Sequence, residues 1–266
     1  MSRETIALGG PAGSGKTHSC LTIAKELPDS KFVFIECDRP NILGMLQYQF
    51  TGLKNVSVIP AYSWGDFRNA VDNIKQQVVS KALGPNDWVI VDGVDLVIQY
   101  TKYEFFSRVY SSDGSGANTW DAMIDKRRGK GDKGGGPLLE PSDWDAIYSQ
   151  YESYMGYLAF IMPCHFIATC GVEPLNLKSM YESDEVKSFY SSMGVYVKFE
   201  GYKRNPRMFN TLILLTADTG GYYYTIWRDT YSARIKDYEK IRNLKQSNRS
   251  FFLSFLAQKA GWGTEG

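Results

Sequence analysis

Short apolar runs alternate with amphipathic stretches over the first two thirds of the chain. Four near-continuous apolar runs predict strands buried on both faces of a sheet, at residues 5–8, 31–36, 55–59 and 88–92. The stretches between and after them have helical spacing, at residues 17–27, 41–50, 64–81 and 94–110. This alternation predicts an α/β fold with a mainly parallel sheet flanked by helices.

The periodicity changes in the later part of the chain. A tyrosine-rich helix is predicted at 142–162 and a further buried strand at 164–170, followed by an acidic, partly helical stretch at 173–192. Alternating patterns then predict three strands that extend the sheet in antiparallel fashion, at 195–200, 208–216 and 222–227. We therefore expect one core domain over residues 1–234 and a helical segment over 235–266, with helices at 235–244 and 248–260.

Residues 111–141 interrupt the periodicity and are rich in Gly, Ser and charge, which predicts a flexible insertion. Its centre holds two acids and five basic residues, a local net charge of +3: Lys126, Arg127, Arg128, Lys130 and Lys133. A solvated, tolerated insertion is one interpretation. The other is a basic arm that contacts nucleic-acid phosphates, with Trp120 available to stack on bases.

Composition limits the classes of protein. The 266 residues are 43% hydrophobic and 22% charged, which is typical of a folded globular chain rather than a disordered one. The net charge of +1 indicates no partner. Any nucleic-acid contact therefore has to come from a local basic patch.

Cysteine spacing and hydropathy favour a cytoplasmic location. Cys20, Cys37, Cys164 and Cys170 form no C-x-x-C pattern, so we expect buried thiols rather than zinc ligands or disulfides. The two histidines, His18 and His165, are expected mainly in packing or local hydrogen bonds. No apolar run reaches 18 residues and residues 1–4 are polar, so neither a membrane span nor a signal peptide is expected.

One motif carries specific chemistry. Residues 10–17 fill the pattern G-x-x-x-x-G-K-[ST], between a predicted strand and a predicted helix: Gly10, Pro11, Ala12, Gly13, Ser14, Gly15, Lys16 and Thr17. Such a loop directs backbone N–H groups at phosphates, its lysine reaches the β- and γ-phosphates of ATP, and its threonine hydroxyl binds Mg²⁺. We add His18, the next residue, to the nucleotide-binding candidates.

Acids at the ends of other strands extend this site. Asp92 ends an apolar strand, as expected of a carboxylate that holds Mg²⁺ beside Thr17, although a helix cap is the alternative. Gly93 follows it, where many motor ATPases place a catalytic glutamate. The catalytic acid is therefore sought in Asp38 or Glu36, with Asp95 as a third option. Thr169 ends another strand, either as a sensor of the γ-phosphate or as a core hydroxyl.

These motifs together resemble those of RecA-like P-loop ATPases, and most closely phage nucleotide-binding proteins related to single-strand annealing and recombination ATPases. The resemblance implies Mg²⁺-dependent ATP hydrolysis, action on single-stranded DNA, and a homo-oligomeric ring or filament. It assigns the catalytic acid to Asp38 and places DNA loops after the strands that end at Asp92 and Cys170. It also implies a finger residue given to a neighbouring subunit by the late strands, with the candidates Lys203, Arg204, Arg207 and Arg228.

Three other classes stay open. A DNA-packaging motor is disfavoured because no acid follows Asp92 and no nuclease domain is evident. A small-molecule kinase would use the same loop with a mobile lid, for which residues 111–141 provide the length. A regulatory subunit that binds nucleotide without hydrolysing it is the third. A GTPase is disfavoured because the sequence has no N-K-x-D motif.

Overall fold

The computed structural model describes residues 3–110, 139, 141–178, 183–192, 197–219, 221–229 and 245–247. The basic residues at 126–133, Trp120 and the helices expected at 235–244 and 248–260 lie outside the described residues.

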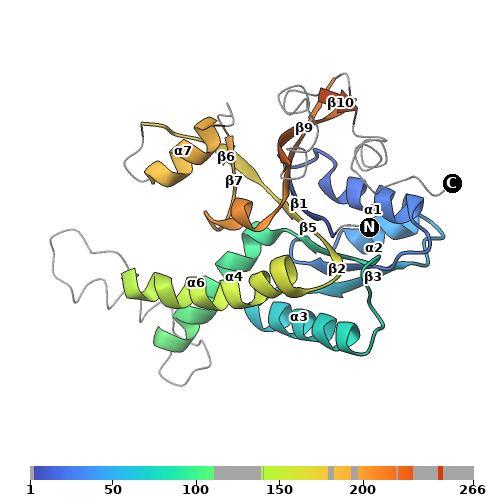
Figure 1. Cartoon of the computed structure of the whole chain (residues 1–266), viewed down its shortest axis with the longest axis horizontal. Helices are drawn as coiled ribbons and strands as arrows, with labels where there is room; N and C mark the ends of the chain where they lie inside the picture. The colour runs from blue at the N-terminus through green and yellow to red at the C-terminus, as the bar shows by residue number, and fades with distance from the viewer. Residues whose placement is uncertain are drawn as a thin grey trace.

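The first half of the chain follows the predicted alternation (Figure 1). Its strands are β1 (Thr5–Gly9), β2 (Phe32–Glu36), β3 (Val56–Pro60) and β4 (Trp88–Asp92), and its helices are α1 (Lys16–Glu26), α2 (Ile42–Tyr48), α3 (Trp64–Val79) and α4 (Val94–Tyr110). Local capping supports α3, because the Ser63 hydroxyl accepts a hydrogen bond from the backbone N–H of Asp66 at 3.1 Å. All eight elements were predicted at nearly these bounds.

The second half begins with helix α6 (Pro141–Gly156), which continues as a π-helical turn over Tyr157–Ile161. Further elements follow along the chain: β5 (His165–Cys170), β6 (Val172–Pro174), α7 (Asp184–Ser192), β7 (Val197–Phe199), a 3₁₀ turn (Asn205–Met208), β8 (Thr211–Asp218), β9 (Gly221–Asp229) and β10 (Lys245–Ser247). The π-helical turn is held by Arg3, whose guanidinium donates to the carbonyl oxygens of Leu158, Ala159 and Cys164 at 2.5–2.8 Å.

The main sheet among the described residues has eight strands in the order β10-β9-β8-β1-β5-β4-β2-β3. Strands β8, β1, β5, β4, β2 and β3 are mutually parallel, whereas β9 and β10 are antiparallel additions at one edge. The strand that carries the glycine-rich loop, β1, is thus separated from the Asp92 strand, β4, by β5. All of their carboxyl ends lie at the same edge of the sheet.

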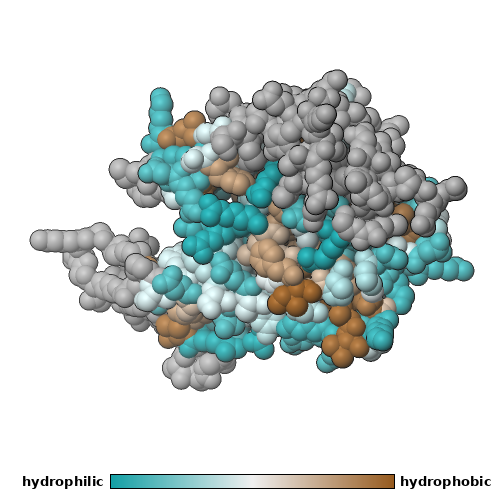
Figure 2. Space-filling model, in the orientation of Figure 1, coloured by the Kyte–Doolittle hydropathy of each residue, from teal (hydrophilic) through white to brown (hydrophobic). Residues whose placement is uncertain are grey.

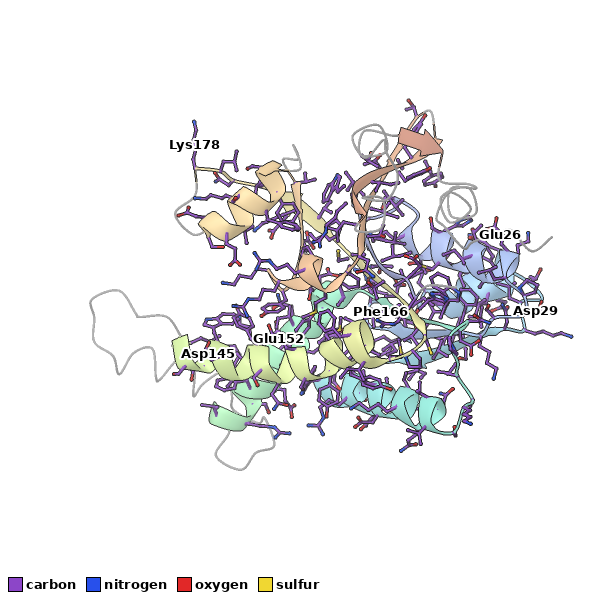
Figure 3. The ribbon with its side chains drawn as sticks, viewed as in Figure 1. Glu26, Asp29, Asp145, Glu152, Phe166 and Lys178 are labelled. Carbon is purple, nitrogen blue, oxygen red and sulfur yellow. The ribbon has the colours of Figure 1, made fainter. Side chains whose placement is uncertain are left out.

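Alternate residues of the strands face two separate cores. Phe32, Phe34, Trp88 and Ile90 pack on the side of α1 and α2. Their neighbours in sequence, such as Val33 and Val89, pack with α3, α4 and α6 on the opposite face, where Phe166 of β5 also lies (Figure 3). Both faces of the sheet are therefore covered, which explains why the interior positions of β2 and β4 are all apolar.

One topological expectation was wrong in part. Strand β8 pairs in parallel with β1, so only β9 extends the sheet in antiparallel fashion as predicted. Strand β7 is not in the main sheet at all and pairs with β6 in a separate two-stranded sheet. An alternating pattern identifies a half-buried strand, but it contains no information about which strand is its partner.

The core also contains one buried histidine, His165. Its ring stacks on Trp88 with centroids 4.4 Å apart, and its Nδ1 atom accepts a hydrogen bond from the backbone N–H of Glu4 at 3.0 Å. Burial, together with the nearby charges of Arg3 and the terminal amino group, lowers the pKa of His165 to about 4. His165 therefore has the packing role expected from the sequence.

This shift predicts a pH-dependent stability. The unfolded chain takes up a proton at His165 near pH 6.5, whereas the folded chain resists protonation until about pH 4. The stability contributed by neutral His165 is therefore complete above pH 6.5 and is lost as the pH falls toward 4, by about 3 kcal/mol in total. Urea unfolding of wild type and His165→Gln at several pH values should show a smaller loss in the variant. Equal losses would contradict this role.

Candidate functional site

The glycine-rich loop joins β1 to α1 in a conformation that requires glycine. Gly13 and Gly15 have φ angles of 78° and 88°, in the left-handed region that side chains with a Cβ atom rarely adopt. Helix α1 begins directly afterwards at Lys16, and no side chain caps its N-terminus. The first N–H groups of α1 are thus left for an anion, which the helix dipole also attracts.

Two polar side chains of the loop, Lys16 and Ser14, are placed to donate hydrogen bonds to a ligand. The Lys16 ammonium donates to the backbone carbonyl oxygens of Gly10 and Pro11, at 2.7 and 3.0 Å, so it curls back over the loop. The Ser14 hydroxyl is only 1% exposed and has no hydrogen-bond partner among the described residues. An oxygen-rich ligand in the loop would provide acceptors for both groups.

Beside the loop, a hydrogen-bonded cluster links three elements. The Thr17 hydroxyl donates to the two carboxylate oxygens of Asp92, at 2.9 and 3.2 Å. The Thr169 hydroxyl, at the end of β5, donates to Asp92 Oδ1 at 2.5 Å and accepts from the backbone N–H of Gly93 at 3.0 Å. The strand register produces this meeting, because Asp92 is paired with Thr169 across β4 and β5. Thr169 thus positions the carboxylate of Asp92.

Asp92 is a carboxylate held in an unfavourable environment. It is 8% exposed, and its pKa is raised chiefly by burial and slightly by the charge of Glu36. The hydrogen bonds from Thr169 and Thr17 and the charge of Lys16 act in the opposite direction and lower the pKa. A cation beside Asp92 would compensate for the lost hydration of its ionised form.

The two acids after β2 have different surroundings. Glu36 is 1% exposed and fully bonded: its Oε1 accepts from the backbone N–H groups of Asn41 and Ile42, both at 2.8 Å, and its Oε2 accepts from the Tyr62 hydroxyl at 3.1 Å. Glu36 therefore holds the start of α2. Asp38 is exposed and lies against Gly93, whose added Cβ would be 3.5 Å from that of Asp38. The structure thus brings Asp38, rather than Glu36, to the open edge beside Asp92.

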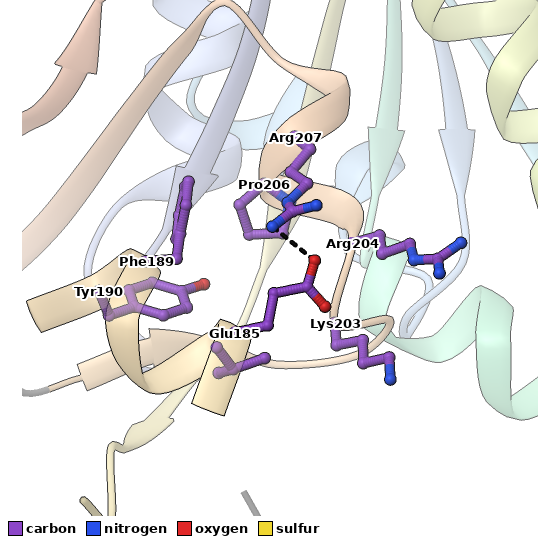
Figure 4. A pocket seen from close by; sticks show the side chains of 8 residues that line it. Glu185, Phe189, Tyr190, Lys203, Arg204, Pro206 and Arg207 are labelled. Carbon is purple, nitrogen blue, oxygen red and sulfur yellow. Dashed lines mark ion pairs between the residues drawn. The ribbon is translucent and has the colours of Figure 1, made fainter. Parts of the chain in front are cut away.

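Three of the four candidate finger residues, Lys203, Arg204 and Arg207, line a small pocket between α7 and the turn after β7 (Figure 4). Arg207 forms an ion pair with Glu185 of α7 at 2.6 Å, and Arg204 lies 3.5 Å from Glu152 of α6, which also accepts a hydrogen bond from Tyr202. Lys203 is exposed beside them, and Arg228 lies elsewhere, on β9. Within the described residues, Arg204 and Arg207 are therefore engaged in ion pairs of this subunit.

The remaining candidates are placed as follows. Pro11, Ala12 and Gly13 are exposed at the mouth of the loop, and His18 is exposed on α1, with its ring 4.9 Å from that of Phe50 in an edge contact. All four cysteines are buried and free, in agreement with the sequence-based expectation.

Sequence analysis missed a segment that approaches the end of β1, just before the loop, from another direction. Phe199, Glu200 and Gly201, at the end of β7, lie against Gly9, Gly171 and Asp95. We call residues 199–201 the bridge segment. Nothing in the sequence pattern indicates it, because its contacts join positions that are 29 to 190 residues apart and depend on close approach to glycines.

The rest of the described surface is mixed in character. Figure 2 shows apolar residues on the viewed face as separate patches. The exposed large apolar side chains are spread over several helices and include Leu43, Tyr48, Val79, Phe160 and Ile161. In the described part of the chain, no helix has the length and apolarity to cross a membrane, and no group of three or more His, Cys, Asp or Glu side chains is placed to hold a metal ion.

Comparison with known proteins gives a limited result. No protein-family model and no curated protein matches the sequence. Among solved structures, a crystal structure of the RadB recombinase is similar with a TM-score of 0.49 and 12% identity, over 92% of this chain and 88% of that chain.

The fold itself is defined by the sheet order and the loop. It is an α/β fold with a mainly parallel sheet, in which one strand lies between the loop strand and the Asp92 strand and antiparallel strands are added beyond β8.

Proposed function

We propose that this protein binds and hydrolyses ATP in complex with Mg²⁺. The observation that carries this proposal is the contact between Thr17 and Asp92, at 2.9 Å, beside an uncapped helix N-terminus. It joins the end of the glycine-rich loop to a buried acid 75 residues away, in an arrangement suited to a metal ion and a triphosphate.

The residues present fit Mg²⁺. A hydroxyl and a carboxylate are oxygen donors of the kind that Mg²⁺ prefers, and the ion usually keeps waters and phosphate oxygens as its other ligands. When bound, Mg²⁺ neutralises phosphate charge that develops during phosphoryl transfer. Thr17 and Asp92 would hold it, and Thr169 would keep the carboxylate of Asp92 in place.

Lys16 and Asp38 have the other main roles in this proposal. Lys16 exchanges the carbonyl oxygens of Gly10 and Pro11 for phosphate oxygens, where it stabilises charge in the transition state. Asp38 orients the attacking water, because it is the exposed acid at this edge, whereas Glu36 is committed to α2.

We further propose that the protein acts on single-stranded DNA as a homo-oligomer in recombination or replication, in a phage setting. This part of the proposal draws on the resemblance of the motifs and on the basic residues at 126–133. These residues come after α4 in the sequence, and α4 is the helix that follows the Asp92 strand. Fingers supplied to a neighbouring subunit by Lys203, Arg204, Arg207 or Arg228 belong to the same proposal.

The roles of the two acids are separable by mutation. Asp92→Asn should weaken Mg²⁺-dependent ATP binding by about tenfold or more, since a unit charge close to the ion is worth several kcal/mol even in a partly solvated site. Asp38→Asn should bind ATP normally and lose turnover by about 10²- to 10⁴-fold. Isothermal titration and steady-state hydrolysis assays measure the two effects.

Glu36→Gln is the matched control for Asp38→Asn. It should lower stability by about 1–3 kcal/mol, because one acceptor oxygen of a buried, fully bonded carboxylate becomes a donor. Its folded fraction should still hydrolyse ATP. If Asp38→Asn abolished ATP binding, or Glu36→Gln removed turnover without loss of stability, the assignment of the two acids would be wrong.

The basic segment provides the test of DNA binding. Neutralising Lys126, Arg127, Arg128, Lys130 and Lys133 together should weaken binding of a labelled single-stranded oligonucleotide. The slope of log affinity against log salt should become shallower by up to about 0.7 for each phosphate that the variant no longer neutralises. A variant with four exposed lysines changed elsewhere, Lys25, Lys54, Lys81 and Lys178, serves as the control. Equal anisotropy-derived slopes for wild type and the neutralised segment would identify residues 111–141 as a tolerated insertion.

A further inference from the structure

The bridge segment touches the carboxyl edge of the sheet through close contacts at three glycines, Gly9, Gly171 and its own Gly201. A Cβ added to Gly9, the residue before the phosphate-binding loop, would lie 2.1 Å from the Phe199 ring. One added to Gly171, directly after β5, would lie 2.2 Å from a carboxylate oxygen of Glu200. Gly201 has a φ of 97°, and its added Cβ would be 2.8 Å from the Cα of Asp95. The bridge segment thus contacts β1, β5 and the first turn of α4 together.

On its other side, the bridge segment is joined to α7 and to the turn with Arg204 and Arg207, which together line the small pocket of Figure 4. The backbone N–H of Phe199 donates to the Tyr190 hydroxyl of α7 at 3.0 Å, and the Phe199 ring stacks on Trp227 with centroids 5.1 Å apart. The turn with Arg204 and Arg207 begins three residues later. A shift of the bridge segment would therefore be transmitted to α7 and to this turn.

Glu200 and Lys16 both act on charged or ionisable groups beside the end of β5. The pKa of Asp95 is raised first by burial and then by the charge of Glu200, and it is lowered by the N–H groups of Asp95 and Gly171 and by the charge of Lys16. The pKa of the buried Cys170 thiol responds to the same three charges of Asp95, Lys16 and Glu200. Lys16, Asp95 and Glu200 therefore surround the end of β5, and two of the three are acids.

A triphosphate adds negative charge to this crowded edge. Lys16 turns from the loop carbonyls toward the phosphates, while the like charge of Glu200 is repelled. Glu200 is held here by one backbone hydrogen bond, from its own N–H to the Gly171 carbonyl oxygen at 3.0 Å, and by packing. This junction is therefore placed to respond to the nucleotide.

We propose that Glu200 is a nucleotide-responsive positioning residue: a triphosphate in the loop repels its carboxylate and displaces the bridge segment from Gly9 and Gly171. The displacement moves the turn that carries Arg204 and Arg207 and loosens their ion pairs with Glu152 and Glu185. The occupied loop thereby frees these guanidinium groups from their carboxylate partners in this chain. This inference rests on the proposed nucleotide binding.

Hydrogen exchange of the full-length protein tests the displacement. With Mg²⁺ and a non-hydrolysable ATP analogue, peptides covering residues 197–210 should exchange faster than without nucleotide, and faster than with ADP. In Glu200→Gln this difference should fall to less than half, and the analogue should bind roughly three- to tenfold more tightly because one repulsive charge is removed. Glu200→Asp, which keeps the charge, should stay close to wild type in both measurements.

Glu173→Gln is the matched control. Glu173 lies on β6, in the same two-stranded sheet, and its carboxylate pairs with Lys198 at 3.1 Å. This variant should leave both the exchange difference and the affinity unchanged. If wild type binds the analogue but exchange over 197–210 is the same with and without it, or if Glu173→Gln has the effect of Glu200→Gln, the inference is wrong. If wild type does not bind the analogue at all, the proposed function fails first.

Discussion

The site depends on one buried carboxylate whose hydration has been replaced by two hydroxyl groups. Asp92 is held between Thr17 and Thr169, so its position is fixed jointly by α1, β4 and β5. The hydrogen bonds offset only part of the cost of burial, since the pKa of Asp92 is still raised. A nearby cation would stabilise the ionised form of such a carboxylate, and this is the property expected of a metal ligand beside a phosphate-binding loop.

The later part of the chain adds a second layer to this site. Strand β8 completes the parallel sheet beside β1. Strand β7 lies outside that sheet, and the bridge segment at its end packs on Gly9, just before the loop. The surroundings of the glycine-rich loop therefore come from two sides: Asp92 bonds to Thr17, and Phe199 packs on Gly9, the residue before the loop. On one side are Asp38, after β2, and Asp92, the last residue of β4, and on the other is Glu200 with Asp95. The turn at 203–207, which carries Lys203, Arg204 and Arg207, is connected to the proposed nucleotide site through this second side.

The sequence predicted the parts of the fold that depend on local patterns. Apolar runs located every central strand, and the glycine-rich loop with Asp92 located the core of the site, because these signals are short and their chemistry is specific. Strand partners were not predictable, since β7 and β8 have similar alternating patterns. Strand β8 nevertheless pairs with β1 in the main sheet, whereas β7 pairs with β6 in a separate one. Likewise, Glu36 and Asp38 are two residues apart, and only the hydrogen bonds of Glu36 to the start of α2 distinguish them. The bridge segment depends on glycines distant in sequence and had no local signal.

The central claim is that the loop and Asp92 form a working site for ATP. Steady-state hydrolysis of ATP with Mg²⁺ by wild type and Lys16→Ala, with and without single-stranded DNA, tests it most directly. We predict hydrolysis by wild type and a loss of about 10²- to 10³-fold in the variant, with an unchanged unfolding midpoint, because Lys16 stabilises charge that grows in the transition state. Equal turnover by the two proteins, or no hydrolysis by wild type under any of these conditions, would contradict the claim.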